Sequence, residues 1–519
     1  MERYPTLPEL VHKRMSETPD VTALTAAEGG SVTWRELYEA SHKWADWLRG
    51  YGVQPEDRVV TIIPQSLESN FAWLGIAATG GVEVSINANF RGEWLRHALE
   101  TSTAKVVIVA ARHLDQVLGA LERTRVETIL VYDGKGAQPA VPGVKVVAED
   151  PEARPFIRPQ KDHFPNRWDI ACVLYTSGTT GASKAVQLPW QQLSLSMAVD
   201  YFGKGRQVFY LPYAPYHLSG RCALFRGALF NGHTVVREVF STSEFWSDVR
   251  KFGCTWTILY SAPTRFLMAQ PERPDDADNP LEWVLQCPIL PEVDRLKERF
   301  GLKAYSVYGM TEICSPIGVP PEYTDTAHVG CCGRPIEGVE ARLVDANDYE
   351  VADGEVGELT VRSSEPWCFT IGYQQAPEAT AKAWRNGWFH TGDMMRKGPD
   401  GLLYYVDRSK DMIRRRGENI SSVELEAELL RHPDVQEAAA LGLPSELGDE
   451  DVMVVVIAKP GVAFDPARLV KDLEDRVPRY ALPRYIRTVE DFPRTQATQR
   501  IEKHKLRAEG VTADTWERK

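Results

Sequence analysis

Several features that would place a chain in a special class are missing from this 519-residue sequence. It holds only eight cysteines and no CxxC pair, so neither a zinc site nor a disulfide scaffold is indicated, and reduced thiols are expected. No apolar run is long enough to span a bilayer, because the best candidate, residues 71–86, contains Gly80, Gly81 and Glu83. The first residues lack the charged-then-apolar pattern of a signal peptide. Together these absences predict a cytoplasmic protein with no membrane span.

An excess of positive charge is also missing. Lys and Arg number 60 against 72 Asp and Glu, which gives a formal net charge of −12. This balance argues against nonspecific nucleic-acid binding and gives no support for an anionic membrane surface as a partner. The hydrophobic share of 43% is ordinary for a globular enzyme, and the length predicts two or more domains.

The N-terminal part of the chain alternates between strand and helix patterns, which predicts a largely parallel α/β sheet. Expected strands are residues 58–63, 82–86, 104–109, 126–132, 170–174, 207–211, 256–260 and 303–308, with helices at 69–78, 93–101 and 191–201. Residues 7–49 have a helical pattern throughout. Residues 134–166 are rich in Pro and charge, which indicates a linker or surface loop.

The C-terminal part changes in composition. Strands expected at 339–344 and 358–361, joined by an acidic turn, indicate a smaller β unit. We place a domain boundary at Asp407, so that residues 1–407 form one domain and residues 408–519 the other. The second is expected to be a small α+β domain, with helices at 423–432 and 466–476 and strands at 435–441 and 452–457.

A loop rich in glycine and hydroxyl side chains follows the expected strand at 170–174. It reads Tyr-Thr-Ser-Gly-Thr-Thr-Gly-Ala-Ser-Lys from Tyr175 to Lys184. Gly178 and Gly181 let the backbone turn, the hydroxyls can donate hydrogen bonds, and Lys184 adds a positive charge, which together suit a polyphosphate. The two glycines lie too close together for a Walker A loop. The alternative interpretation is an ordinary Gly/Ser/Thr surface loop.

Three more candidates lie at the ends of expected strands or turns, where α/β proteins form ligand crevices. His217 closes an apolar strand and its turn, and functional and structural roles both remain open. Glu312 follows the strand at 303–308. Beside a polyphosphate its carboxylate requires a cation, so it is a candidate Mg²⁺ ligand, or else a solvated turn residue. Asp393 follows a Thr-Gly turn and could accept hydrogen bonds from a ribose diol, or form an Asx turn.

In this order, the motifs resemble those of the adenylate-forming enzymes, a superfamily that includes acyl-CoA synthetases, firefly-type luciferases and peptide-synthetase adenylation domains. The resemblance extends from about Leu7 to Leu506 and is closest to the acyl-CoA synthetases. It implies an α/β fold with a large N-terminal domain of parallel-rich sheets and a small β unit, then a small mobile α+β domain with a hinge near Lys410. It also implies that ATP and Mg²⁺ activate a carboxylic acid as an acyl-adenylate with release of pyrophosphate, and that transfer to CoA releases AMP.

The resemblance also implies roles for individual residues. The nucleotide would be held by Thr176, Ser177, Gly178, Thr179, Thr180, Gly181, Lys184, Tyr308, Gly309, Thr311, Asp393 and Arg408, with Glu312 as the Mg²⁺ ligand. Within that set, Tyr308 would stack on adenine, Thr311 would contact the α-phosphate, and Asp393 would bind the ribose. The acid would lie in a pocket of His217, Leu218, Arg221, Tyr305, Gly309 and Cys314, with His217 as a gate. Gly417 would border the pantetheine tunnel.

Three departures from the family pattern concern the site. Ser183-Lys184-Ala185 replaces the usual Pro-Lys-Gly, and residues 285–288 read Leu-Gln-Cys-Pro where the family has Gly-Gly-Ala-Pro beside adenine. The second change reshapes the purine or acyl pocket. In the tail, Arg500 stands where the family has its catalytic lysine and is expected to take that role, with Lys503 or Lys505 as alternatives.

Other functions remain open from the sequence. The acceptor could be an amine or a carrier-protein thiol, or the enzyme could activate nitrite for aryl diazo formation. A nucleotide-binding protein that lost turnover when the tail lysine changed is a third reading, although intact Lys184, Thr311, Glu312 and Asp393 argue against it. The expected partners are a small carboxylic acid and CoA, and not nucleic acid.

Overall fold

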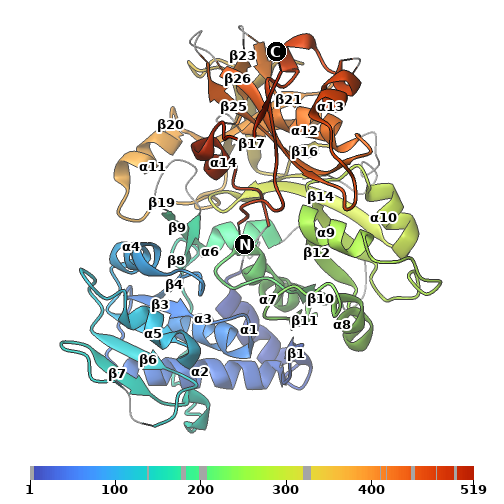
Figure 1. The fold of residues 1–519 in the computed structure, drawn as a ribbon. Coiled ribbons are helices and arrows are strands. Elements are labelled where there is room, and N and C mark those ends of the chain that lie inside the picture. The colour runs from blue at the N-terminus through green and yellow to red at the C-terminus, as the bar shows by residue number, and fades with distance from the viewer. Residues whose placement is uncertain are drawn as a thin grey trace. The chain divides into compact units, whose positions relative to one another are not determined.

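The computed structural model describes residues 5–136, 139–176, 183–197, 207–319, 329–408, 411–415, 418–445, 450–474, 476–495 and 499–518. The chain divides into two compact units, which are treated separately below. The first unit comprises Met1–Val329, Pro335–Val339 and Ser363–Lys382, and the second comprises Gly330–Arg334, Glu340–Arg362 and Ala383–Lys519. Figure 1 shows the elements of both units. The domain boundary at Asp407 stays a prediction.

An eight-stranded sheet in the first unit has the order β19-β9-β8-β4-β3-β5-β6-β7. From β8 onward the strands are parallel, whereas β9 pairs antiparallel with both β8 and β19. Its strands are β3 (Arg58–Ile62), β4 (Val82–Ser85), β5 (Val106–Val109), β6 (Thr128–Val131), β7 (Lys145–Ala148), β8 (Ile170–Thr176), β9 (Lys184–Pro189) and β19 (Gly372–Tyr373). The predicted largely parallel α/β sheet is confirmed.

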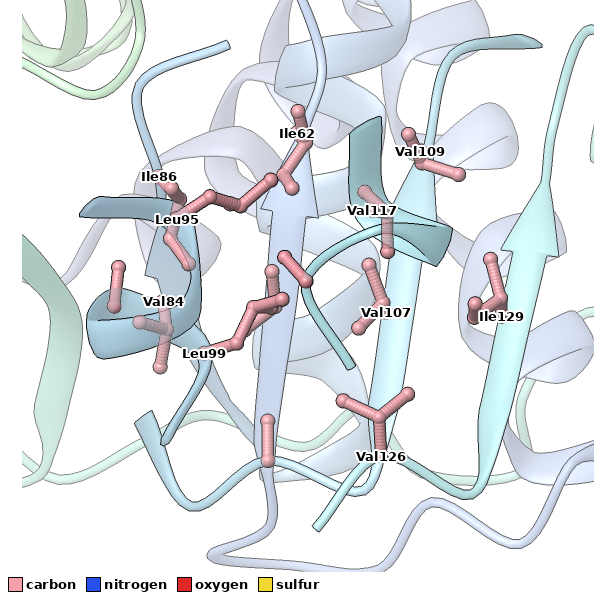
Figure 2. Packing of buried hydrophobic residues seen from close by; sticks show 14 of the residues in the cluster. Ile62, Val84, Ile86, Leu95, Leu99, Val107, Val109, Val117, Val126 and Ile129 are labelled. Atoms are coloured by element: carbon pink, nitrogen blue, oxygen red, sulfur yellow. The ribbon is translucent and has the colours of Figure 1, made fainter. Parts of the chain in front are cut away.

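Helices α4 (Gly92–Ser102) and α5 (Leu114–Leu118) cover one face of this sheet with aliphatic side chains. Figure 2 shows Leu95 and Leu99 of α4, and Val117 of α5, packed over the aliphatic residues of strands β3 to β6. All three side chains are fully buried. Burial of an aliphatic side chain of this size stabilises a fold by about 1.5–3 kcal/mol. Helix α4 is therefore held firmly on the sheet.

The other strands of the first unit follow the order β15-β14-β13-β12-β10-β11-β1-β2. They are parallel from β14 to β1, with an antiparallel pair at each end. The strands are β1 (Thr22–Ala26), β2 (Ser31–Thr33), β10 (Val208–Leu211), β11 (His233–Val236), β12 (Trp256–Tyr260), β13 (Trp283–Cys287), β14 (Lys303–Met310) and β15 (Cys314–Val319). Helices α3 (Leu67–Thr79) and α6 (Trp190–Met197) contact strands of both sets. Helices α7 (Leu218–Phe230), α8 (Phe245–Phe252), α9 (Ser261–Met268) and α10 (Val293–Phe300) accompany the strands of this second set.

The expectation that residues 7–49 are helical throughout is wrong in its middle part. Helices α1 (Leu7–Glu17) and α2 (Trp34–Gly50) do form, and each begins at a capping box, on Thr6 and Thr33 respectively. Strands β1 and β2 lie between them, because β1 pairs in parallel with the distant strand β11. Tertiary pairing of this kind overrides a weak local pattern.

The segment 134–166, expected as a linker or surface loop, lies along helix α2. Among its described residues only β7 and a short turn at Pro151–Ala153 are regular. Trp47 Nε1 donates a hydrogen bond to Glu149 Oε2 at 3.0 Å, and Trp44 Nε1 donates to Glu152 Oε1 at 2.8 Å. Hydrogen bonds from two tryptophans of α2 thus hold this segment against the helix.

The second unit contains a small β unit and an α+β part. Both parts were predicted, the β unit as a part of the N-terminal domain. The β unit has the strand order β17-β18-β21-β22-β16, with β20 beside β21, and the α+β part has the order β25-β26-β27-β28. These strands are β16 (Cys331–Pro335), β17 (Val339–Val344), β18 (Val356–Ser363), β20 (Trp384–Arg385), β21 (Trp388–Lys397), β22 (Leu403–Arg408), β25 (Val435–Pro444), β26 (Glu450–Ala458), β27 (Tyr485–Thr488) and β28 (Trp516–Glu517). The pair β23 (Ile413–Arg415) and β24 (Glu418–Ile420) and helices α12 (Ser422–Leu430), α13 (Pro466–Leu473) and α14 (Lys503–Glu509) complete it.

All eight cysteines are free thiols, and seven of them are buried. Of the helices that the structure describes, none combines the length and the apolar character that crossing a bilayer requires.

Candidate active site

Strands β8 and β9 bring the two ends of the predicted phosphate loop together. Thr176 at the end of β8 is paired with Lys184 at the start of β9. The intervening loop residues of the prediction, Ser177, Gly178, Thr179, Thr180 and Gly181, lie outside the described part of the chain. On the helix side, His97 of α4 has its Nε2 atom 3.1 Å from the carbonyl oxygen of Ser183. The end of the loop is therefore fixed by a sheet ladder and by a helix.

Tyr373 connects the predicted phosphate-binding lysine to the predicted metal-binding glutamate. The Lys184 Nζ atom lies 4.8 Å from the centroid of the Tyr373 ring, and the Tyr373 hydroxyl donates a hydrogen bond to Glu312 Oε1 at 2.8 Å. Glu312 is only 4% exposed, so its carboxylate is held within the fold. The structure thus places Lys184 over the ring face and Glu312 at the hydroxyl of one aromatic side chain.

The backbone around Glu312 is fixed by further hydrogen bonds. The Glu312 carbonyl accepts from the Thr370 N–H at 2.7 Å, and the Thr311 carbonyl accepts from Gln192 Nε2 at 2.9 Å. Gly309 has no room for a side chain, because a Cβ there would lie 1.8 Å from the Cys314 carbonyl oxygen. Tyr308, the predicted adenine platform, is 8% exposed on β14. These contacts give the turn after β14 a single defined path.

His217 immediately precedes α7, where it is the N-cap residue. Its Nε2 atom is buried and has no hydrogen-bond partner among the described residues, and its ring packs against Tyr216 with centroids 4.6 Å apart. Burial lowers the pKa of His217 to about 4, so the imidazole is neutral near pH 7. A neutral ring with an unpaired nitrogen suits a gate beside a carboxylate pocket. Leu218 follows it as a half-buried residue.

Two other predicted pocket residues make contacts within the core. The Arg221 guanidinium pairs with the Glu83 carboxylate at 2.5 Å, and both side chains are 1% exposed. Arg221 also lies over the Trp73 ring, 4.8 Å from its centroid. Tyr305 is 1% exposed, and its hydroxyl accepts a hydrogen bond from Trp256 Nε1 at 2.8 Å. A substrate contact by Arg221 would have to compete with this ion pair. Cys314, another predicted pocket residue, is also buried.

In the second unit, Asp393 and Arg408 are cross-strand partners on β21 and β22. Arg408 Nε lies 2.6 Å from Asp393 Oδ1, and Asp393 is 1% exposed. The Asp393 N–H donates to Thr391 Oγ1 at 3.1 Å, and the Gly392 N–H donates to Glu358 Oε1 at 2.9 Å. Thr391, Gly392 and Asp393 lie within the continuous strand β21, so the Thr-Gly turn expected from the sequence is wrong, and Gly392 instead takes a φ of +70° inside the strand.

The tail offers one arginine and two lysines for the predicted catalytic role. Lys503 Nζ is 2.6 Å from the half-buried carboxylate of Glu426, and Lys505 Nζ is 2.5 Å from Glu502. Arg500 is exposed. Burial and the charge of Asp393 raise the pKa of the Tyr405 phenol, and the positive charge of Arg500 opposes this rise. Both lysines are occupied by ion pairs, so this arrangement favours Arg500 for the tail role. The hinge residue Lys410 and the tunnel residue Gly417 lie outside the described residues.

Two family models match the chain, and the matches follow the order of these motifs. The AMP-binding enzyme model matches residues 11–373, and the AMP-binding enzyme C-terminal domain model matches residues 424–498. The first match covers more than half of the chain and includes Lys184, Glu312 and Tyr373. The chain belongs to the AMP-binding enzyme family. The resemblance to adenylate-forming enzymes is thereby confirmed.

Relatives of this AMP-binding enzyme align over nearly their whole length. The crotonobetaine/carnitine–CoA ligase of Salmonella typhimurium LT2 is 29% identical over 483 residues, which cover 91% of this chain and 92% of that protein. The protein of the same name from Escherichia coli strain ATCC 8739 is 29% identical over 504 residues, covering 93% and 95%.

Solved structures share the fold of this AMP-binding enzyme. ATP-bound MatB from Rhodopseudomonas palustris superimposes with a TM-score of 0.84 at 23% identity, covering 97% of this chain and 98% of that one. The anthranilate–CoA ligase AuaEII in complex with anthranoyl-AMP gives a TM-score of 0.85 at 23% identity, covering 98% of both chains. At this identity the likeness shows the fold alone, and the predicted fold class is confirmed.

The low pKa of His217 predicts how the stability of this AMP-binding enzyme depends on pH. Above pH 6.5 the imidazole is neutral in the folded and unfolded chain alike, so it contributes no pH dependence. As the pH falls from 6.5 to about 4, the unfolded chain gains a proton that the folded chain does not, and the free energy of unfolding falls. The free energies of unfolding of the wild type and His217→Asn, measured by denaturant titration, should therefore approach each other as the pH falls. A difference between the two free energies that does not change with pH would contradict the assignment.

Sequence reasoning did not identify Tyr373 or His97. Tyr373 carries no local signal beyond a Gly-Tyr dipeptide, and its role depends on the pairing of β19 with β9. His97 lies in a helix with an ordinary amphipathic pattern, so its contact with Ser183 becomes visible only in three dimensions.

Proposed function

We propose that this enzyme is an AMP-forming acid–CoA ligase. In the first half-reaction a carboxylate is joined to the AMP portion of ATP as an acyl-adenylate, and pyrophosphate leaves. In the second, the thiol of CoA takes the acyl group, and AMP leaves. The observation that carries the proposal is the family membership, with Lys184 and Glu312 placed around one side chain at the end of the phosphate loop. The relatives are CoA ligases by name, which supports CoA as the acceptor.

The first half-reaction makes a poor electrophile reactive. A carboxylate oxygen attacks the α-phosphorus of ATP, and the bond from that phosphorus to the oxygen bridging to the β-phosphate breaks, so its electron pair leaves with pyrophosphate. Charge builds on the phosphate oxygens, and fixed positive groups stabilise it most in a site that excludes water. We assign this role to Lys184 at the end of the loop, with Thr311 at the α-phosphate. Asp393 is assigned to the ribose hydroxyls.

The second half-reaction forms a thioester. The CoA sulfur, after losing its proton, attacks the acyl carbon, and the bond from that carbon to the phosphate oxygen breaks with departure of AMP. The hinge role of Lys410 and the tunnel role of Gly417 belong to this proposal. The use of ATP and CoA also fits the cytoplasmic location that the sequence predicts.

The residues present fit a magnesium ion that arrives with the nucleotide. Such ions are bound by one or two carboxylates together with phosphate and water oxygens. Glu312 supplies one carboxylate, oriented by Tyr373. In the parts of the chain that the structure describes, no group of three or more His, Cys, Asp or Glu could hold a metal by itself. When bound, Mg²⁺ supplies charge neutralisation on the phosphates.

The proposal is tested with a panel of carboxylic acids. We expect ATP–pyrophosphate exchange with a suitable acid in the absence of CoA, and continuous AMP release only when CoA is present. AMP release at full turnover without CoA would exclude CoA as the required acceptor. Separate reactions containing an amine, or nitrite with an arylamine, identify the acceptors left open by the sequence. ATP binding without exchange for any acid would indicate a protein that has lost turnover.

Arg500 provides a prediction about the tail. Arg500→Ala should slow pyrophosphate exchange by about 10²–10³-fold, because it removes a positive group from the first half-reaction. Thioester formation from a supplied acyl-adenylate should fall much less. Lys459→Ala is the control, since Lys459 is an exposed cation of the second unit to which no role in the site is assigned. Equal losses in both half-reactions would show that Arg500 does not have this role.

A further inference from the structure

Tyr373 is held rigidly at the edge of the sheet that carries the phosphate loop. Its strand β19 pairs antiparallel with β9, with Tyr373 opposite Val186. The Tyr373 N–H donates to Thr380 Oγ1 at 2.9 Å. Gly372 before it has a φ of +135°, and a Cβ there would lie 2.6 Å from Thr380 Cγ2. This backbone path therefore requires glycine, and it leaves the tyrosine ring little freedom.

The side chain contacts two groups of opposite charge, one through its hydroxyl and one through its ring face. The hydroxyl donates to Glu312 Oε1 at 2.8 Å, and the ring face lies 4.8 Å from Lys184 Nζ. Tyr373 is 8% exposed, so both contacts are largely shielded from water. The negative face of an aromatic ring attracts an ammonium group without neutralising it. Among the described residues, no carboxylate forms an ion pair with Lys184, so the lysine keeps its charge for a ligand.

We propose that Tyr373 is a positioning residue that keeps Lys184 and Glu312 apart and orients both for a magnesium-bound triphosphate. The hydroxyl fixes the Glu312 carboxylate, and the ring fixes the resting place of the Lys184 ammonium. Without this side chain, Lys184 and Glu312 would be free to form an ion pair, and that ion pair would have to break before the nucleotide binds. The inference rests on the proposed function, because it assigns Lys184 and Glu312 to the same nucleotide.

Two substitutions separate the two halves of the side chain. Tyr373→Phe removes the hydroxyl and keeps the ring, whereas Tyr373→Leu removes both. The matched control is Tyr210→Phe, because the Tyr210 hydroxyl also donates to a carboxylate, Asp248 Oδ2, at 2.8 Å in the core. Tyr210 is fully buried, so the control removes a comparable hydrogen bond away from the predicted site.

Calorimetric titration with ATP, in EDTA and in excess MgCl₂, provides a measurement independent of turnover. For Tyr373→Phe we expect unchanged affinity in EDTA and about tenfold weaker affinity with Mg²⁺, since a hydrogen bond to a charged group is lost. For Tyr373→Leu we expect weaker binding in both conditions. Tyr210→Phe should match the wild type in both, and thermal melts of the three variants show that each is folded.

The outcomes separate this inference from the proposed function. Wild-type affinities in both conditions for a folded Tyr373→Phe would overturn the positioning role and leave the ligase proposal standing. An equal loss of ATP affinity for Tyr373→Phe in EDTA and in MgCl₂ would also overturn the positioning role, because the hydroxyl would then not act through the metal ligand Glu312. A wild-type protein that binds no ATP would overturn both.

Discussion

Replacing Lys184 with alanine should reduce ATP–pyrophosphate exchange by about 10²–10³-fold, because preorganised charge at a phosphoryl centre contributes on that scale. Lys184 is the first residue of β9 and stands at the end of the phosphate loop, where strand pairing with Thr176 fixes its backbone. Its ammonium rests over the Tyr373 ring and is therefore available to a ligand. The loss should appear mainly in the rate of exchange at saturating ATP.

The control for this variant uses a lysine in the same local geometry. Lys145 Nζ lies 4.8 Å from the centroid of the Tyr51 ring, the same distance as Lys184 Nζ from that of Tyr373, but Lys145 is an exposed residue at the start of β7. Lys145→Ala should exchange pyrophosphate at the wild-type rate. If the two variants behaved alike, Lys184 would be an ordinary surface cation and the phosphate-binding role of the loop would be wrong.

Local patterns were sufficient for the parallel sheet, because each strand carries its own apolar run. The glycine and hydroxyl loop after β8 also carries its signal within ten residues, and the structure adds the partner strand β9 at its end. Asp393 was expected after a Thr-Gly turn, but it lies inside strand β21, because pairing with β18 and β22 extends the strand through the Thr-Gly pair. The roles of these residues stay predictions.

Residues positioned by distant segments could not be found in this way. Tyr373 acts through the pairing of β19 with β9, and strand β1 forms because β11 lies beside it. Neither pairing leaves a trace in the local hydrophobic pattern. The same reason applies to the contact of Arg221. The resemblance assigns Arg221 to the substrate pocket, and its ion pair with Glu83 of β4 becomes visible only in the structure. The charge of Glu83 within an expected strand was the only local sign of that pair.

Replacing Glu83 with alanine should be among the most destabilising single changes in the first unit. It would leave the Arg221 guanidinium buried without its carboxylate, and breaking a buried ion pair from one side costs about 3–5 kcal/mol. Glu83 also accepts a hydrogen bond from Thr61 Oγ1 at 2.7 Å, which would be lost as well. The free energy of unfolding in urea is the measurement. Asp20→Ala, which breaks the exposed pair of Asp20 and Arg35, should change it by less than about 1 kcal/mol.

The double variant Glu83→Leu with Arg221→Met decides whether the pair itself stabilises the fold. Buried ion pairs replaced by apolar residues of similar size are often neutral or stabilising, because the cost of desolvating two charges disappears. We therefore expect the double variant to recover most of the stability lost in Glu83→Ala. The Trp73 ring beneath Arg221 can pack against the methionine as it does against the guanidinium. A double variant as unstable as Glu83→Ala would mean that the attraction between the two charges exceeds the cost of burying them. The ion pair itself would then stabilise the contact of α7 with β4.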